Sequence, residues 1–329
     1  MIADQDSSTT ADMALMLLMK SPEVQLLGIT VITGNSWRDE EVAHALRMVE
    51  GLGRTDIPVF AGAVFPLIRT AEETRLFDRL YGKVSFLGAY TDTNAPVGWD
   101  KVDPARMPEG LPKIHTADEN AAQFMVRMVH AHPHQVTIMA LGPLTNVAIA
   151  CRLDPHFAEL AQELVLMGGS LNPQTNAAEW INRPRHEFNF WFDPEATSIV
   201  LREKWAKVTT TTIDVSIKTR AEPEVLDGLA KAHSAAAQWV TKYTPRPLFP
   251  NYLWDEMAVA AWLDPSLILG ERFVYMDVAT DHGAAYGDTL IYTEADKPSL
   301  TPSQVHAITD VDLPRLQKMI VERLSVEKE

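Results

Sequence analysis

Three aspartates gather at the very start of the chain, in "MIADQDSSTTADMAL". Asp4, Asp6 and Asp12 lie within nine positions, between a short apolar run typical of a strand and a run typical of a helix. Carboxylates held this close repel one another unless a cation or shared protons relieve the repulsion. Ligation by oxygen atoms alone suits Ca²⁺ or Mg²⁺. The pattern therefore favours a cation-binding or catalytic role for Asp4 and Asp6.

A structural alternative stays open for Asp12. Thr9 or Thr10 is typical of a residue that caps the following helix, and Asp12 would then be stabilised by the helix dipole.

A D-x-D sequence after a strand is also typical of phosphoryl transfer of the haloacid-dehalogenase type. Asp4 would then be the nucleophile and Asp6 the acid and base. That chemistry requires a Ser or Thr at a later strand end, a lysine, and a second acidic pair that binds Mg²⁺. The stretch "TVITGN" supplies the first, but we find no acidic pair after a strand. This D-x-D phosphatase is the weakest of the interpretations.

Composition excludes several classes of protein. The 329 residues carry a net charge of −15, which argues against nucleic acid as a partner because phosphate binding depends on basic patches. No apolar run approaches the roughly 20 residues of a membrane span. Cys151 is the single cysteine, so neither an internal disulfide nor a thiolate cluster can form. We expect a soluble protein, and the sequence leaves open whether a leader was trimmed and whether the protein is cytoplasmic or exported.

Short β-rich runs alternate with helical patterns along the whole chain. This alternation predicts one α/β domain over residues 1–329, with an open, mainly parallel sheet flanked by helices and a Rossmann-like core. Strands are expected within residues 24–34, 57–62, 136–142, 163–169 and 207–216. Helices are expected within residues 38–53, 117–132, 143–153, 193–205 and from 255 on, with Pro143 in a first turn.

Two stretches interrupt this alternation. Residues 64–116 are rich in proline and are expected to run over the sheet, and residues 170–188 form a long polar loop after a strand. Ligands of open α/β sheets bind at the carboxyl ends of the strands, so the second loop is expected beside a binding site.

Seven segments together resemble one known family. They are "ADQD", "SPEVQLLGITVITGN", "TDIPVFAGAVFPL", "MALGPLTNVAIACRLDP", "ELVLMGGSL", "EFNFWFDPEA" and "WDEMAVAAWL". In this order they resemble the inosine–uridine-preferring nucleoside hydrolases over almost the whole chain, and "GPLTN" and "EFN…DPEA" are the most specific. The resemblance implies a nucleoside hydrolase-like α/β fold, a bound Ca²⁺, hydrolysis of the N-glycosidic bond of ribonucleosides, and a homodimer or homotetramer.

The resemblance also implies roles for individual residues. Asp6 would hold the cation and take a proton from the cation-bound water that attacks the ribose. The implied metal ligands are Asp4, Asp6, Asp12, the backbone carbonyl of Thr145, and Asp255.

Hydrogen bonds would hold the ribose, and such bonds suit an oxocarbenium-like transition state. One apolar side chain would line the same pocket. Two asparagines compete for one further contact in the lengthened loop. The implied substrate-binding residues are Asn35, Met167, Asn176, Asn182, Glu187 and Asn189.

The chain departs from the family pattern at three places, the third of which is Tyr81 in "LYGKVSFLG", where the family often has His-Gly. Thr10 and Ala11 stand where the family has an adjacent acidic pair, and Asp12 comes one position late, which rotates its side chain by about 100° on a helix. Fewer carboxylates would weaken Ca²⁺ binding. Trp254 stands where these relatives have a histidine that protonates the leaving base.

Tryptophan is not a proton donor of that kind, but it stacks on a base. We therefore expect Trp254 to act on the leaving base, with Tyr81 and Tyr252 beside it. Further aromatic residues that could close over the base are Trp239, Tyr243 and Phe249.

These inferences predict an N-ribohydrolase that acts on a nucleoside or related ribosyl compound through Ca²⁺-bound water. The alternative from another class is a non-catalytic or altered-specificity member that binds a ribosyl or polyol ligand.

Overall fold

The structure is a computed structural model that describes residues 1–9, 11–92, 98–173, 180–181, 183–244 and 251–327. In this part of the chain nine strands form one sheet in the order β10-β9-β11-β6-β5-β4-β1-β2-β3. The strands are β1 (Ile2–Gln5), β2 (Gly28–Val31), β3 (Val59–Ala61), β4 (Thr137–Ala140), β5 (Glu163–Met167), β6 (Val208–Thr211), β9 (Ile268–Val278), β10 (Thr289–Tyr292) and β11 (Val305–Val311). β1 to β6 and β11 run parallel, and β9 is antiparallel to both of its neighbours.

The chain changes direction across the sheet at β1. From β1 it proceeds through β2 to β3 on one side, and β4, β5 and β6 then extend the sheet on the other side. Asp4 lies opposite Thr30 of β2 and Ala140 of β4. Ligand sites of open α/β sheets lie at such switch points, so the first motif occupies the expected position.

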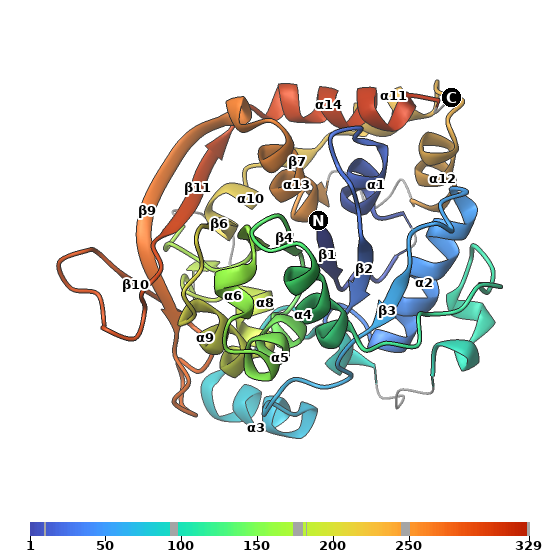
Figure 1. The fold of residues 1–329 in the computed structure, drawn as a ribbon. Helices are drawn as coiled ribbons and strands as arrows, with labels where there is room; N and C mark the ends of the chain where they lie inside the picture. The colour runs from blue at the N-terminus through green and yellow to red at the C-terminus, as the bar shows by residue number, and fades with distance from the viewer. Residues whose placement is uncertain (10, 93–97, 174–179, 182, 245–250, 328–329) are drawn as a thin grey trace.

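Helices cover both faces of the sheet (Figure 1). Along β1, Ile2 belongs to one hydrophobic cluster and Ala3 to the other, because successive strand side chains point to opposite faces. The Ala3 face packs against α1 (Met13–Lys20), α2 (Arg38–Gly51), α11 (Pro223–Leu229), α12 (Ala235–Tyr243), α13 (Asp255–Leu263) and α14 (Leu313–Ser325). The Ile2 face packs against α4 (Ala121–Ala131), α5 (Thr145–Leu153), α6 (Phe157–Leu160) and α9 (Pro194–Leu201).

The remaining elements lie in the connecting segments. α3 (Ala71–Tyr81) and the 3₁₀ turns η1 (Gly88–Thr91), η2 (Trp99–Lys101) and η3 (Pro104–Arg106) lie in the proline-rich excursion. α8 (Phe188–Phe192) follows the long polar loop, α10 (Ile213–Ser216) follows β6, and η5 (Pro265–Leu267) precedes β9. β7 (Arg220–Ala221) pairs with β8 (Asn251–Tyr252) as a separate two-stranded ladder.

The mainly parallel sheet predicted from the sequence is confirmed, with two local corrections. The strand expected over residues 207–216 ends at Thr211, and the chain turns into α10 at Ile213. Pro143 lies before α5 rather than in its first turn, because Leu144 is the N-terminal cap. Within the described residues, no helix has the length and apolar character needed to cross a bilayer.

Candidate active site

A cavity of about 340 Å³ lies at the carboxyl ends of the central strands. Most of its lining residues come from the loops after β1, β2, β4 and β5, from α8, and from the start of α13. They are Asp6, Asn35, Phe86, Leu141, Met167, Trp180, His186, Glu187, Phe188, Asn189, Ile213, Tyr252, Trp254 and Asp255. Eight of the residues expected at the site from the sequence therefore line one cavity, namely Asp6, Asn35, Met167, Glu187, Asn189, Tyr252, Trp254 and Asp255.

Asp6 is buried at the floor of this cavity. Its Oδ2 accepts a hydrogen bond from the backbone N–H of Asn35 at 3.0 Å. A Cβ atom on Gly34 would lie only 1.9 Å from the same oxygen, so this close approach requires glycine. Burial raises the pKa of Asp6 to about 8, and the charges of Asp4, Glu187 and Asp12 add to the rise. Asp6 is thus held among like charges.

Asp4 is fully buried behind the cavity and lies outside its lining. Its Oδ1 accepts hydrogen bonds from the Thr30 hydroxyl at 2.7 Å and from Asn146 Nδ2 at 2.8 Å. Its Oδ2 is buried without a hydrogen-bond partner. Burial raises the pKa of Asp4 to about 7. One oxygen of this carboxylate is therefore fixed and the other is unsatisfied.

Asp12 caps α1. Its carboxylate accepts a hydrogen bond from the backbone N–H of Leu15 at 2.9 Å, and burial raises its pKa to about 6. Thr9 does not cap the helix as the sequence suggested, because its hydroxyl accepts from the backbone N–H of Ala11 instead. Thr10 lies outside the described residues.

Asp255 opens α13 directly after Trp254. Burial raises its pKa well above the usual range, and the charges of Asp6 and Asp12 raise it further. The first loop and the start of α13 therefore bring their carboxylates to the same corner of the cavity, although they are far apart in the sequence.

Thr145 lies at the start of α5, outside the cavity lining. Its hydroxyl donates to Asp193 Oδ2 at 2.6 Å, which ties "GPLTN" to "DPEA". The neighbouring Asn146 holds Asp4 and also accepts from the backbone N–H of Ala63 at 2.8 Å. The two motifs that are most specific for the family are thus in direct contact.

Glu187 caps α8 and faces the cavity. Its Oε1 accepts from the backbone N–H of Asn189 at 2.8 Å, and its Oε2 accepts from those of Phe190 at 2.9 Å and Gly169 at 3.0 Å. Burial raises the pKa of Glu187 to about 7. Asn189 Nδ2 donates to the backbone carbonyl of Met167 at 3.0 Å. Both side chains are therefore fixed in place before any ligand arrives.

Aromatic rings form two walls of the cavity. Trp254 lies 5.4 Å from Tyr252 and 6.3 Å from Trp180 between ring centroids. Phe86 and Phe188 form a second pair, 4.8 Å apart.

Three of the aromatic residues expected around a base lie outside the cavity lining. Tyr81 packs on Phe77 at the end of α3 and is 43% exposed. Trp239 packs on Tyr243 and beside Gly51 of α2, because α12 turns this pair toward α2. Phe249, together with Asn176 and Asn182, lies outside the described residues.

Two buried side chains at the site were missed from the sequence. His186 lines the cavity, its Nδ1 has no hydrogen-bond partner, and burial lowers its pKa to about 3, so the imidazole is neutral. Its position directly before "EFN" was the available signal. Glu41 of α2 is fully buried near Asp6, and it lies on a helix that the sequence linked to no chemistry.

The donors at this site suit a hard cation in chemical type. All the carboxylates named offer oxygen, and one oxygen each of Asp4 and Glu41 is buried without a partner. Across the described residues, no three Asp, Glu, His or Cys side chains already converge as a metal site. The hypothesis of a bound cation therefore rests on the oxygen donor atoms at this site and not on a preformed coordination sphere.

Comparisons with known proteins agree with this arrangement. The family model described as "Inosine-uridine preferring nucleoside hydrolase" matches residues 1–318. The chain is 31% identical to a probable uridine nucleosidase 2 of Arabidopsis thaliana, over 98% of this chain and 96% of that protein. It is 27% identical to an inosine-uridine preferring nucleoside hydrolase of Leishmania major, over 94% and 93%.

A solved plant nucleoside hydrolase has a similar structure. It superposes with a TM-score of 0.73 at 25% identity, over 99% of this chain and 98% of that one. Because the family model and the full-length relatives cover nearly every residue, including both specific motifs, the chain belongs to the inosine-uridine preferring nucleoside hydrolase family.

Proposed function

We propose that this protein is an N-ribohydrolase that cleaves the N-glycosidic bond of a ribonucleoside or a closely related ribosyl compound with a divalent cation, expected to be Ca²⁺. The observation that carries the proposal is the single cavity in which Asp6 and Asp255 meet Glu187 and Asn189. Relatives over nearly the full length are named as a probable uridine nucleosidase and an inosine-uridine preferring nucleoside hydrolase, which supports this substrate class.

The cation would be held by Asp6, Asp255 and the backbone carbonyl of Thr145, with Asp4 and Asp12 contributing negative charge. Bound there, a divalent cation lowers the pKa of a coordinated water molecule toward neutrality. Asp6 accepts the proton of the attacking water, because its carboxylate is buried at the cavity floor and is oriented by the Asn35 N–H.

The sugar is held by Asn35, Glu187 and Asn189, while Met167 lines its apolar side. A buried carboxylate such as Glu187 stabilises the positive charge that develops on the sugar ring during cleavage. Its three backbone hydrogen bonds keep it in place, so little reorganisation is needed during the reaction.

Trp254, Tyr252 and Trp180 stack around the leaving base. Trp254 would bind the leaving base by stacking and would not protonate it, since an indole cannot supply an acidic proton at neutral pH. We also propose a homodimer or homotetramer, for which light scattering would give two or four times the chain mass of 36.6 kDa.

The test is ribose release from a panel of purine and pyrimidine nucleosides, with Ca²⁺ in excess. We expect the wild-type protein to cleave at least one of them, and Asp6→Asn to reduce kcat by about 10³-fold. Asp56→Asn, an exposed change on another surface, is the control. Nucleoside binding that survives Asp6→Asn, without cleavage by either form, would instead establish a non-catalytic binding protein.

A further inference from the structure

Glu41 is a fully buried carboxylate with one unsatisfied oxygen. Its Oε1 accepts from the backbone N–H of Ser36 at 2.6 Å, while its Oε2 is buried and has no hydrogen-bond partner. Leaving a charged oxygen unpaired in the protein interior is costly.

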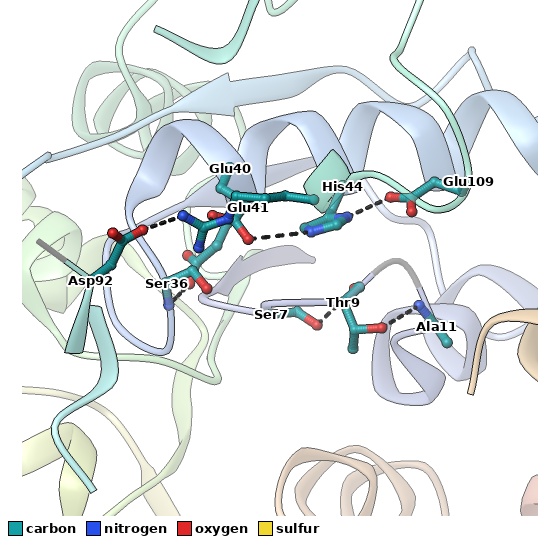
Figure 2. A network of polar contacts seen from close by, with 10 residues as sticks. Ser7, Thr9, Ala11, Ser36, Glu40, Glu41, His44, Asp92 and Glu109 are labelled. Atoms are coloured by element: carbon teal, nitrogen blue, oxygen red, sulfur yellow. Dashed lines mark hydrogen bonds and ion pairs between the residues drawn. The ribbon is translucent and has the colours of Figure 1, made fainter. Parts of the chain in front are cut away.

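Three neighbouring carboxylates, those of Glu40, Glu109 and Asp92, form ion pairs, as Figure 2 shows. His44 contacts both Glu109 and Glu40, and Arg106 contacts Glu40 at 2.6 Å and also Asp92. Glu41, which follows Glu40 on α2, has no such ion pair. None of the ion pairs formed by the described residues includes Glu41.

Negative charges act on Glu41. Burial raises the pKa of Glu41 well above its usual value, and the charges of Asp6, Glu40 and Asp4 raise it further. Asp6 and Glu41 accept hydrogen bonds from the consecutive backbone N–H groups of Asn35 and Ser36, which places both carboxylates at the same loop.

Asp4 gives a second, independent observation. Its Oδ2 is also buried and unpartnered, so two unsatisfied carboxylate oxygens, one from β1 and one from α2, belong to residues that interact with Asp6. The nearby cations do not neutralise this group. Arg38 is committed to Asp39 and the carbonyl of Gly62, and His44 and Arg106 are committed as described.

We propose that Glu41 is part of the cation centre, as a carboxylate supplied by α2 beside Asp6. This inference rests on the proposed function, because it assigns a further residue to the cation expected there. A divalent cation satisfies several buried carboxylates at once, which neither a single proton nor the paired side chains nearby can do. The first loop, "DSSTTAD", offers no second carboxylate directly after Asp6, and Glu41 provides one from another element.

Calorimetric titration with CaCl₂ alone, on the complete chain, tests this assignment. Glu41→Gln keeps an oxygen that can accept from Ser36, removes the charge and replaces the unpaired oxygen with an amide NH₂ group. We expect it to raise the Kd for Ca²⁺ by about tenfold or more. The matched control is Glu40→Gln, the neighbouring residue on α2, which breaks pairs with Arg106 and His44 but is expected to leave the Kd within about threefold of wild type.

Thermal unfolding gives a readout that does not depend on activity. Without Ca²⁺, Glu41→Gln should melt at or above the wild-type temperature because an unpaired buried charge is gone. With Ca²⁺ well above the wild-type Kd, the order should reverse, since wild type gains more from binding. A purely structural role would lower the melting temperature equally under both conditions.

Each outcome decides between the claims. If wild type and Glu41→Gln bind Ca²⁺ equally, the assignment of Glu41 is wrong and the proposed function is unaffected. If wild type binds no Ca²⁺ at millimolar concentration, the assignment and the cation of the proposed mechanism both fail. Should Glu41→Gln not fold, Glu41→Asp is measured instead. An unchanged Kd for Ca²⁺ in Glu41→Asp, in which the carboxylate is one methylene group closer to the backbone, would then overturn the assignment.

Discussion

At the scale of single residues, the site is a set of buried carboxylates fixed by backbone amides. Asp6 is oriented by the Asn35 N–H, and Glu187 by three N–H groups around α8. Such bonds hold negative charge in the interior without a basic side chain. Burial nevertheless raises the pKa of Asp6 to about 8 and that of Glu187 to about 7, and a cation or a positively charged sugar beside them would favour their charged forms.

Replacing Trp254 tests whether its ring binds the leaving base. Trp254→Ala removes the ring expected to stack on the base, and base stacking contributes about 1–3 kcal/mol. We expect kcat/KM for the best nucleoside to fall about 5- to 150-fold, while Trp254→Phe retains most of it. Steady-state kinetics with Trp239→Ala as a control, a tryptophan outside the cavity lining, would check this. Equal losses in both alanine variants would show that Trp254 has only a structural effect.

Most residues of the site could be predicted from the sequence because motif order fixes which strand end carries them. Asn35, Glu187 and Asp255 follow or begin regular elements, and the parallel sheet brings those ends together. His186 and Glu41 could not be predicted in this way. Their significance comes from burial without a partner, and a helix pattern does not reveal which of two adjacent acidic residues is paired.

At the scale of elements, α2 is held against the segment after α3 by an ion-pair network. His44 contacts Glu109 and Glu40, and Arg106 contacts Glu40 and Asp92. The proline-rich residues 64–116 were expected to form a long excursion over the sheet. This excursion contains α3 and three 3₁₀ turns, and the ion pairs that attach it to α2 join residues too far apart in the sequence to be recognised beforehand.

The network predicts a pH-dependent stability. Burial opposes the charged form of His44, but its hydrogen bonds to Glu109 and Glu40 outweigh this and raise its pKa above 6.5. The stabilisation is therefore complete below the unfolded pKa, about 6.5, and is lost as the pH rises through the higher folded pKa.

Urea unfolding of His44→Gln measures this effect. We expect the variant to be about 2 kcal/mol less stable than wild type at pH 5.5, with a smaller difference at pH 9. His156→Gln, on an exposed side chain, is the control. A difference that is constant over this pH range would contradict the ionised pair.

At the scale of the whole molecule, Arg69 connects segments that are remote in the sequence. Its guanidinium lies 4.6 Å from the ring centroid of Trp191 and 4.1 Å from that of Tyr286, and its Nη2 donates to the Tyr286 carbonyl. Arg69 thus joins the loop before α3 to α8 and to the loop between β9 and β10. Sequence patterns could predict the sheet but not such contacts between loops.

Replacing Arg69 should therefore destabilise the folded protein. A desolvated cation–π contact contributes about 2 kcal/mol, so we expect Arg69→Ala to reduce the free energy of unfolding by about 2–4 kcal/mol. Arg75→Ala, an exposed arginine on α3, should change it by less than about 0.5 kcal/mol. Guanidinium chloride denaturation checks both values, and an unchanged midpoint for Arg69→Ala would refute this role.

The central claim is that water cleaves a nucleoside in the cavity shared by Asp6 and Asp255. Its most direct measurement is mass spectrometry of the products formed in H₂¹⁸O with Ca²⁺ and inorganic phosphate both present. We predict free base without label and ribose with one ¹⁸O, incorporated at C1. Formation of ribose 1-phosphate, or recovery of the intact nucleoside after prolonged incubation with every member of the panel, would contradict the claim.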